Sequence, residues 1–150
     1  MIEAETFISE AKERVIEQLR ARRNAGKYDT IVAVVQSPAD TFHTGTPFET
    51  SQPQFDFCAE RHALHNLFHA NPEFTSFKRL FVAGPVPDTS ESVTTPCGAC
   101  RHALHEANPE ATVYCSHFIR EPEGWNEFPS VEQFTVEELY PSAYDPPTWE

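Results

Sequence analysis

The stretches that decide the fold are CAER at residues 58–61 and PCGACR at residues 96–101. Each stretch opens a segment whose apolar residues repeat at helical spacing, so we expect a helix after each. Free backbone N–H groups and the helix dipole favour a thiolate at such a position. In the second stretch the two cysteines are three residues apart, so they lie on one face of the helix. The sequence thus predicts three thiolates at the starts of two helices.

The three cysteines, Cys58, Cys97 and Cys100, have the chemistry of a zinc site. Zinc binds thiolates tetrahedrally, and three protein ligands leave one position open for water. The pKa of a water bound there falls toward ~7, which makes it a nucleophile at neutral pH. Glu60 lies two residues after Cys58 and is not needed as a ligand. We therefore expect Glu60 to hold that water and shuttle its proton, a role worth about 10²–10⁴-fold in rate.

Two arginines follow residues of this site directly, Arg61 after Glu60 and Arg101 after Cys100. Three thiolates on one zinc ion leave a net negative charge, which would weaken the metal as a Lewis acid. Guanidinium donors aimed at the sulfurs would offset that charge. The alternative for each arginine is an ordinary surface ion pair.

Strands and helices alternate along the chain. We expect helices at 3–22, 58–70 and 97–107, strands at 30–36, 41–46, 79–83 and 111–118, and a last helical turn or two at 135–140. In the first helix the apolar face is predicted to hold Ile8, Ala11, Val15 and Leu19. This alternation favours an α/β fold, a three-layer α/β/α sandwich with a mixed central sheet that is parallel at least in part. The length suits one domain over residues 1–150.

The charge of the chain restricts its partners. Eleven basic residues against twenty-three acidic ones give a formal net charge of −12. Such a charge repels phosphate backbones and anionic lipids, so we expect neither nucleic acid nor a membrane as a partner, and a small-molecule substrate instead. No apolar run approaches the roughly 20 residues that span a bilayer, and the first residues lack the pattern of a signal peptide. We therefore expect a cytoplasmic protein.

The two cysteine stretches together resemble the signature of the cytidine deaminase family, CAER followed by PCxxCR. The resemblance covers the chain from about Gly45 to the C-terminus. It implies one zinc per subunit on the three cysteines, Glu60 as the catalytic proton shuttle, and hydrolytic deamination of a cytidine-like aminopyrimidine nucleoside with release of ammonia. The resemblance also implies a role in nucleoside metabolism, in pyrimidine salvage.

The same resemblance implies substrate-binding residues. Gly45, Glu49 and Cys58 have the spacing of the family tract G-x-N-x-E that leads into the first cysteine, which implies that Glu49 accepts hydrogen bonds from sugar hydroxyls. By the same analogy the backbone at Ala59 contacts the pyrimidine, and the carbonyl of Thr95 accepts a hydrogen bond from the leaving amine.

The end of the chain carries a further likeness. Residues 135–144, TVEELYPSAY, resemble the family ending TVxELLPxAF. In that ending an aromatic residue of one subunit stacks on the base bound in a neighbour. Tyr144 takes that place, so the resemblance implies a homotetramer with shared sites.

Two departures from the family pattern touch the substrate pocket. Pro47 stands where the family has its ribose-binding Asn, and residues 27–34 replace the family tract PYSxFxVGAA without its stacking Phe. A short first strand and an ending with Tyr144 and Trp149 also resemble blasticidin-S deaminase, which acts on a nucleoside antibiotic. A modified nucleoside or an antibiotic such as blasticidin S is therefore the alternative substrate.

Three other readings of the cysteines stay open. A structural zinc site with four cysteines would need Cys115, whose apolar neighbours in a strand favour a buried, inert thiol. A redox C-x-x-C pair would explain neither Cys58 nor Glu60. A non-catalytic, zinc-containing ligand-binding protein of the same fold would not require the carboxylate of Glu60.

Overall fold

A computed structural model describes residues 2–86, 93–121, 124–126, 128 and 130–144. The elements in chain order are α1 (Ala4–Asn24), β1 (Val32–Gln36), β2 (Phe42–Gly45), the 3₁₀ turn η1 (Pro53–Phe55), α2 (Ala59–Ala70), β3 (Arg79–Val86), α3 (Gly98–Ala107), β4 (Thr112–Glu121), β5 (Gly124–Asn126), β6 (Val131–Thr135) and α4 (Val136–Leu139). The expected helices and the four expected strands are all present, with ends that differ by a few residues.

The strands form one mixed sheet in the order β2-β1-β3-β4. Strands β3 and β4 run parallel, whereas β1 pairs antiparallel with both β2 and β3. The outer edge of β4 pairs antiparallel with β6 along its first half and with β5 near its end. The parallel pair is joined by a crossover through α3, as parallel strands require. The expected mixed sheet is therefore confirmed.

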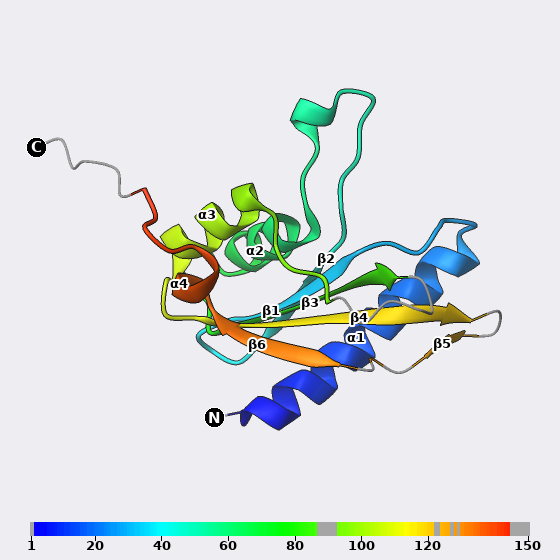
Figure 1. Ribbon diagram of the computed structural model, residues 1–150, viewed down its shortest axis with the longest axis horizontal. Helices are drawn as coiled ribbons and strands as arrows, with labels where there is room; N and C mark the ends of the chain where they lie inside the picture. Colours follow the sequence, from blue (N-terminus) through cyan, green and yellow to red (C-terminus); the bar gives the residue numbers. More distant parts are fainter. Residues whose placement is uncertain (1, 87–92, 122–123, 127, 129, 145–150) are drawn as a thin grey trace, which may run out of the picture.

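Helices cover both faces of this sheet, which gives three layers (Figure 1). Strand β1 is buried along its whole length, as expected for a central strand with both faces covered. Its side chains alternate: Val32 and Val34 pack in the cluster that contains α1, and Ala33 and Val35 pack in the cluster that contains α2, α3 and α4. The three-layer α/β/α sandwich expected from the sequence is confirmed.

The buried stripe of α1 differs by one position from the expected one. Phe7, Ala11, Val15 and Leu19 are fully buried, each four residues after the last. Ile8 is only partly buried at the edge of the same cluster. Both residues fit a helical period, because Phe7 lies four residues and Ile8 three residues before Ala11, and both spacings return to the same side of a helix. The ring of Phe7 stacks on Phe42 of β2, which settles the choice.

The sequence patterns do not predict β5 and β6, the two strands that pair with the outer edge of β4. Strand β6 has exposed side chains at Glu132 and Gln133 and so lacks a clear apolar alternation. Strand β5 is three residues long, too short for a pattern to show. The segment between β3 and α3 lies partly outside the described residues. Within the described part, no helix is both long and apolar enough to cross a membrane.

Gly45, at the end of β2, lies directly against the first turns of α2. A Cβ atom at this position would overlap backbone atoms of Ala59 and Ala63. Backbone atoms inside a helix cannot move aside as a flexible side chain can. The close approach therefore fixes where α2 begins relative to the sheet, and with it the position of Cys58.

We expect Gly45→Ala to lower the thermal unfolding midpoint by roughly 2–12 °C, because overpacking costs about 1–3 kcal/mol. Differential scanning calorimetry measures the change. Gly124→Ala is the control, since a Cβ there meets no atom within 4 Å. Equal midpoints for Gly45→Ala and the wild type would contradict the close contact between Gly45 and the backbone of α2.

Candidate active site

Cys58 and Cys97 occupy equivalent positions at the starts of two helices. Cys58 immediately precedes α2, and its carbonyl accepts the first helical hydrogen bond from the His62 N–H at 3.1 Å. Cys97 immediately precedes α3, and its carbonyl accepts the corresponding bond from the Arg101 N–H at 2.9 Å. Because both side chains stand at helix N-termini, free N–H groups of each first turn favour negative charge on the sulfurs.

The two helix starts lie together at one end of the strands. Strand β1 begins at this end and β2 finishes there, since Ala33 pairs with Gly45. Strand β3 runs toward the same end, since Val32 pairs with Ala83. The segment before α3 is tied to the neighbouring strand by the Thr94 N–H, which donates to the Ser116 carbonyl of β4 at 2.9 Å. Ligands of open α/β sheets bind at such edges, beyond the carboxyl ends of the parallel strands.

The sulfurs of Cys58, Cys97 and Cys100 lie within 4.8 Å of one another, and those of Cys58 and Cys97 are 3.5 Å apart. Tetrahedral zinc with Zn–S bonds of about 2.3 Å requires S···S separations of about 3.8 Å. The spacing of the three sulfurs therefore fits one metal ion, and the cluster could bind one. Among the described residues it is the only such group of metal-binding side chains.

The fourth cysteine is not part of this cluster. Cys115 is fully buried in the core between the sheet and α2. Burial raises the pKa of its thiol to about 12, so it stays protonated at neutral pH. This position does not support a structural site with four cysteines.

Two of the clustered thiols, Cys97 and Cys100, differ in how readily they ionise. Burial opposes ionisation of Cys97, but the backbone N–H of Cys100 and the Cys58 side chain outweigh it and lower the pKa of Cys97. Burial and the charge of Glu60 raise the pKa of Cys100. Thiolates this close repel one another, so ionising all three requires a cation among them. A divalent metal ion would meet that requirement.

Glu60 is buried beside the cluster, with 4% of its surface exposed. Burial raises the pKa of its carboxyl above the usual value, although its own backbone N–H, the Cys100 thiol and Arg61 act in the opposite direction. A carboxyl with a raised pKa takes up and releases a proton nearer neutral pH, which suits general acid–base catalysis.

The two arginines take different positions. Arg61, predicted to offset thiolate charge, extends its Nη2 to 3.6 Å from the Cys58 sulfur. Arg101 was expected to do the same, but its Nε donates to the Pro96 carbonyl at 2.7 Å and its Nη1 to the Leu139 carbonyl at 2.8 Å. Arg101 therefore ties the residue before Cys97 to the end of α4, because α4 docks beside α3 and offers its last carbonyl.

A hollow of about 250 Å³ opens over the cysteine cluster. Its lining residues are Ile31, Pro47, Glu49, Asp56, Phe57, Cys58, Ala59, Glu60, Thr94, Thr95 and Cys97. The structure thus brings Glu49, Ala59 and Thr95 into one cavity with the cluster. Pro47, the departure from the family pattern, lies in the same wall.

Solved structures of similar shape identify the fold. The cytidine deaminase of Burkholderia pseudomallei has a TM-score of 0.67 and 22% identity, covering 88% of this chain and 98% of that one. The cytidine deaminase of Mycobacterium tuberculosis has a TM-score of 0.60 and 17% identity, covering 91% and 96%. That of Bacillus anthracis has a TM-score of 0.59 and 18% identity, covering 88% and 86%. The fold is that of the cytidine deaminases. No family model and no curated protein matches the sequence.

Four residues of the hollow in this cytidine deaminase fold are not predicted by the sequence patterns. Asp56 and Phe57 come directly before Cys58, and Thr94 comes directly before Thr95, so their nearness in the chain was a usable signal. Ile31 precedes β1 and reaches the hollow only through the pairing of β1 with β2 and β3, which the sequence does not show.

Tyr144 lies outside this hollow. Its side chain is 64% exposed after the end of α4, and it does not line the cavity of its own chain. Trp149 lies outside the described residues. The position of Tyr144 leaves its ring available to another molecule.

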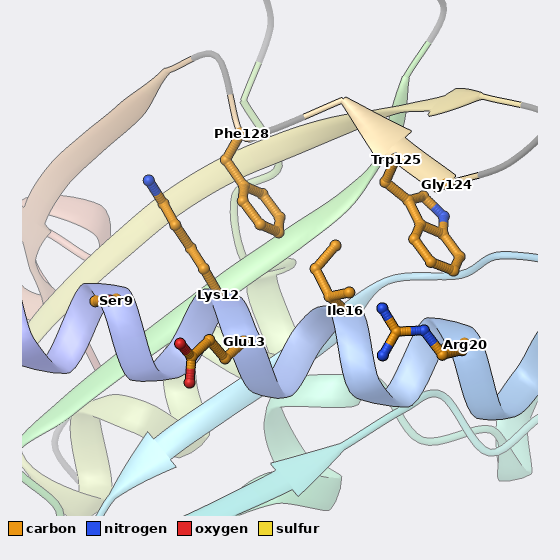
Figure 2. A pocket seen from close by; sticks show the side chains of 8 residues that line it. All are labelled: Ser9, Lys12, Glu13, Ile16, Arg20, Gly124, Trp125 and Phe128. Carbon is orange, nitrogen blue, oxygen red and sulfur yellow. The ribbon is translucent and has the colours of Figure 1, made fainter.

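A larger groove, of about 660 Å³, lies on the face of the cytidine deaminase fold that carries α1 (Figure 2). Figure 2 shows Lys12, Ile16 and Arg20 along α1, with Trp125 and Phe128 across from them. No cysteine lines this groove. Size alone therefore does not mark the reactive site, and the smaller hollow holds the groups that can perform chemistry.

Proposed function

We propose that this protein is a zinc-dependent hydrolytic deaminase of a cytidine-like aminopyrimidine nucleoside, which it converts to the uridine-type product with release of ammonia. One observation carries the proposal: the three sulfurs of Cys58, Cys97 and Cys100 lie within 4.8 Å of one another, and the buried Glu60 lines the same hollow. The fold shared with cytidine deaminases supports it.

The three cysteines would hold one zinc ion per subunit. Zinc binds cysteine thiolates, and the separations of the three sulfurs suit its tetrahedral geometry with one position left open. Bound zinc supplies Lewis-acid chemistry that activates water at neutral pH. Arg61, at 3.6 Å from the Cys58 sulfur, would withdraw negative charge from the thiolates and keep the metal a stronger Lewis acid.

Glu60 would move the protons of the reaction. Water adds at C4 of the pyrimidine, and Glu60 passes one proton of the water to N3, so that a neutral tetrahedral adduct forms. Glu60 then takes the proton of the new C4 hydroxyl and delivers it to the amino nitrogen; the C4–N bond breaks, ammonia leaves and the C4 carbonyl of the product forms. Burial of Glu60 supports this role, because it raises the pKa of the carboxyl toward neutral pH.

The other residues of the hollow would hold the substrate. Ala59 would contact the pyrimidine through its backbone, the Thr95 carbonyl would accept a hydrogen bond from the leaving amine, and Glu49 would accept hydrogen bonds from sugar hydroxyls. Pro47 has no side-chain donor or acceptor for a sugar. Its place in the wall supports a preference for a modified nucleoside, with blasticidin S as one candidate, over plain cytidine.

The test is an ammonia-release assay on zinc-loaded protein with cytidine, deoxycytidine, cytosine, blasticidin S and modified cytosine nucleosides. Turnover of at least one aminopyrimidine nucleoside is expected. A clear preference for cytidine over all others would contradict the role given to Pro47. Binding of zinc and nucleosides without any ammonia release would contradict the enzyme and favour a ligand-binding protein of this fold.

We further propose that the chain forms a homotetramer. Residues 46–57, here called the aromatic arm, extend away from the helices with η1 at the tip (Figure 1). The arm exposes Phe48, Phe55 and Phe57, with 56%, 62% and 51% of their surfaces accessible. A hollow of about 450 Å³ at its base is lined by Phe48 and Phe57 together with α2. Exposed aromatic groups beside a hollow are typical of protein interfaces.

The double variant Phe48→Ser, Phe55→Ser is expected to reduce the mass in solution from that of four 17.0-kDa chains toward that of one. Light scattering coupled to size-exclusion chromatography measures it. Tyr28→Ser is the matched control, since Tyr28 is 83% exposed and lies outside the arm. A wild-type protein that runs as a monomer would contradict the tetramer.

A further inference from the structure

The side chain of Arg101 joins two parts of the fold that are far apart in the chain. Its Nε donates to the Pro96 carbonyl at 2.7 Å, and its Nη1 donates to the Leu139 carbonyl at 2.8 Å. The side chain is half-buried, and the donors of a guanidinium keep a fixed planar arrangement. Arg101 therefore holds the two carbonyls at one position relative to each other, which the single ammonium group of a lysine cannot do.

The first of these carbonyls belongs to the peptide bond between Pro96 and Cys97, one of the three clustered cysteines. Pro96 has no N–H group that could donate a hydrogen bond. Within the described part of the chain, the bond from Arg101 is the only hydrogen bond to the backbone of Thr95 or Pro96. The orientation of the peptide that leads into Cys97 therefore depends on the Arg101 side chain.

The second carbonyl ends α4, which is only four residues long. A helix this short is not stable alone, so its position depends on contacts with its neighbours. Leu139 packs in the same core cluster as Leu104 of α3. Nδ1 of His102, the residue after Arg101, lies 3.0 Å from the Tyr140 hydroxyl. Two adjacent residues of α3 therefore hold the end of α4, just before the C-terminal residues of the chain.

We propose that Arg101 is a positioning residue for the metal centre and makes zinc binding by Cys97 depend on the docking of α4. The guanidinium acts through the Pro96 carbonyl, and its role is not to offset the charge of the sulfurs. When α4 is docked, Arg101 keeps the peptide before Cys97 in the orientation that brings the three sulfurs together. When α4 is loosened, zinc leaves faster. The inference rests on the proposed function, because it concerns the zinc site of that proposal.

The rate at which zinc passes from the loaded protein to an excess of a chromophoric chelator tests this role. Arg101→Lys keeps the positive charge but cannot hold both carbonyls. We expect it to release zinc about tenfold faster or more, since changing a residue that supports a metal ligand typically weakens metal binding by about 10–100-fold. Arg22→Lys is the matched control and should keep the wild-type rate. Nε of Arg22 also donates to a backbone carbonyl, that of Tyr28 at 2.9 Å, but Arg22 lies on α1 and outside the hollow.

A second variant alters α4 without changing the segment before Cys97. The Thr135 hydroxyl accepts from the Glu138 N–H at 3.1 Å and caps the start of α4, so Thr135→Ala should loosen this helix. If Arg101 transmits the docking of α4, Thr135→Ala should release zinc about threefold faster or more. In the double variant with Arg101→Lys, it should add little to the effect of Arg101→Lys, because the connection is already broken.

Cobalt in place of zinc gives a readout that a general loss of stability would not change. The visible absorption of Co²⁺ bound to thiolates depends on how the ligands are arranged around the ion. Arg101→Lys is expected to shift or weaken the thiolate bands of the cobalt-loaded protein, because the Cys97 sulfur is no longer held in place. Arg22→Lys should give the wild-type spectrum.

The outcomes separate this role from the proposed function. A wild-type release rate and a wild-type cobalt spectrum in Arg101→Lys would overturn the positioning role, since the positive charge alone would then suffice. Additive effects in the double variant would also overturn it, because Thr135 and Arg101 would then act independently. If zinc-loaded wild-type protein releases no ammonia from any nucleoside, the deaminase function fails, while the zinc and cobalt measurements still decide the role of Arg101.

Discussion

The variant Glu60→Gln is expected to lose at least about two orders of magnitude in the rate of ammonia release while it keeps its metal. Gln has nearly the shape of Glu but cannot take up or release the proton. Glu60 is buried beside the cysteine cluster, where it lines the hollow. Because the change removes proton transfer and leaves the sulfurs untouched, kcat should fall while the zinc content stays at one per chain.

Steady-state kinetics and metal analysis on the same preparation test this expectation. Glu110→Gln removes an equal charge at an exposed position outside the hollow and should keep the wild-type rate. Near-normal turnover in Glu60→Gln would refute the assigned role. A loss of zinc in this variant would mean that Glu60 is a ligand.

The variant Cys100→Ala is expected to lose both zinc and activity, because one of three metal ligands is gone. Removing a residue that only supports a ligand typically weakens metal binding by about 10–100-fold, so the loss of a ligand itself should cost about 100-fold or more. Titration with a chromophoric zinc chelator measures the affinity, and the ammonia assay measures the activity.

Cys115→Ala is the matched control for this change. Cys100 and Cys115 are both fully buried thiols, but Cys115 lies in the core outside the cluster. Cys115→Ala should therefore keep its zinc and its activity and lose only about 1 kcal/mol of stability from the small cavity. Equal zinc affinity in the two variants would exclude the assigned ligand set.

Local patterns in the sequence predicted most of the fold. The β-branched run in β1 and the helical repeats of α2 and α3 depend on neighbours close in the chain, so the sequence shows them directly. The positions of Cys58 and Cys97 at helix starts were also visible, because a helix start is a local feature. The repeat in α1 showed a helix but could not separate Phe7 from Ile8, which only the contact with Phe42 decides.

Features that depend on distant segments were not predictable. Strand β6 exists because the edge of β4 accepts it, although its exposed Glu132 and Gln133 weaken its own signal. The bond from Arg101 to the Leu139 carbonyl depends on the docking of α4. The bridge between Phe48 and Phe57 closes a segment that has no strand pattern of its own.

X-ray absorption at the zinc edge, on purified protein whose metal content has been measured, tests the central claim most directly. The sulfurs of Cys58, Cys97 and Cys100 predict one zinc per chain with three sulfur neighbours at about 2.3 Å and one lighter atom at about 2.0 Å. Protein without bound zinc, or zinc surrounded by four sulfurs, would contradict the account.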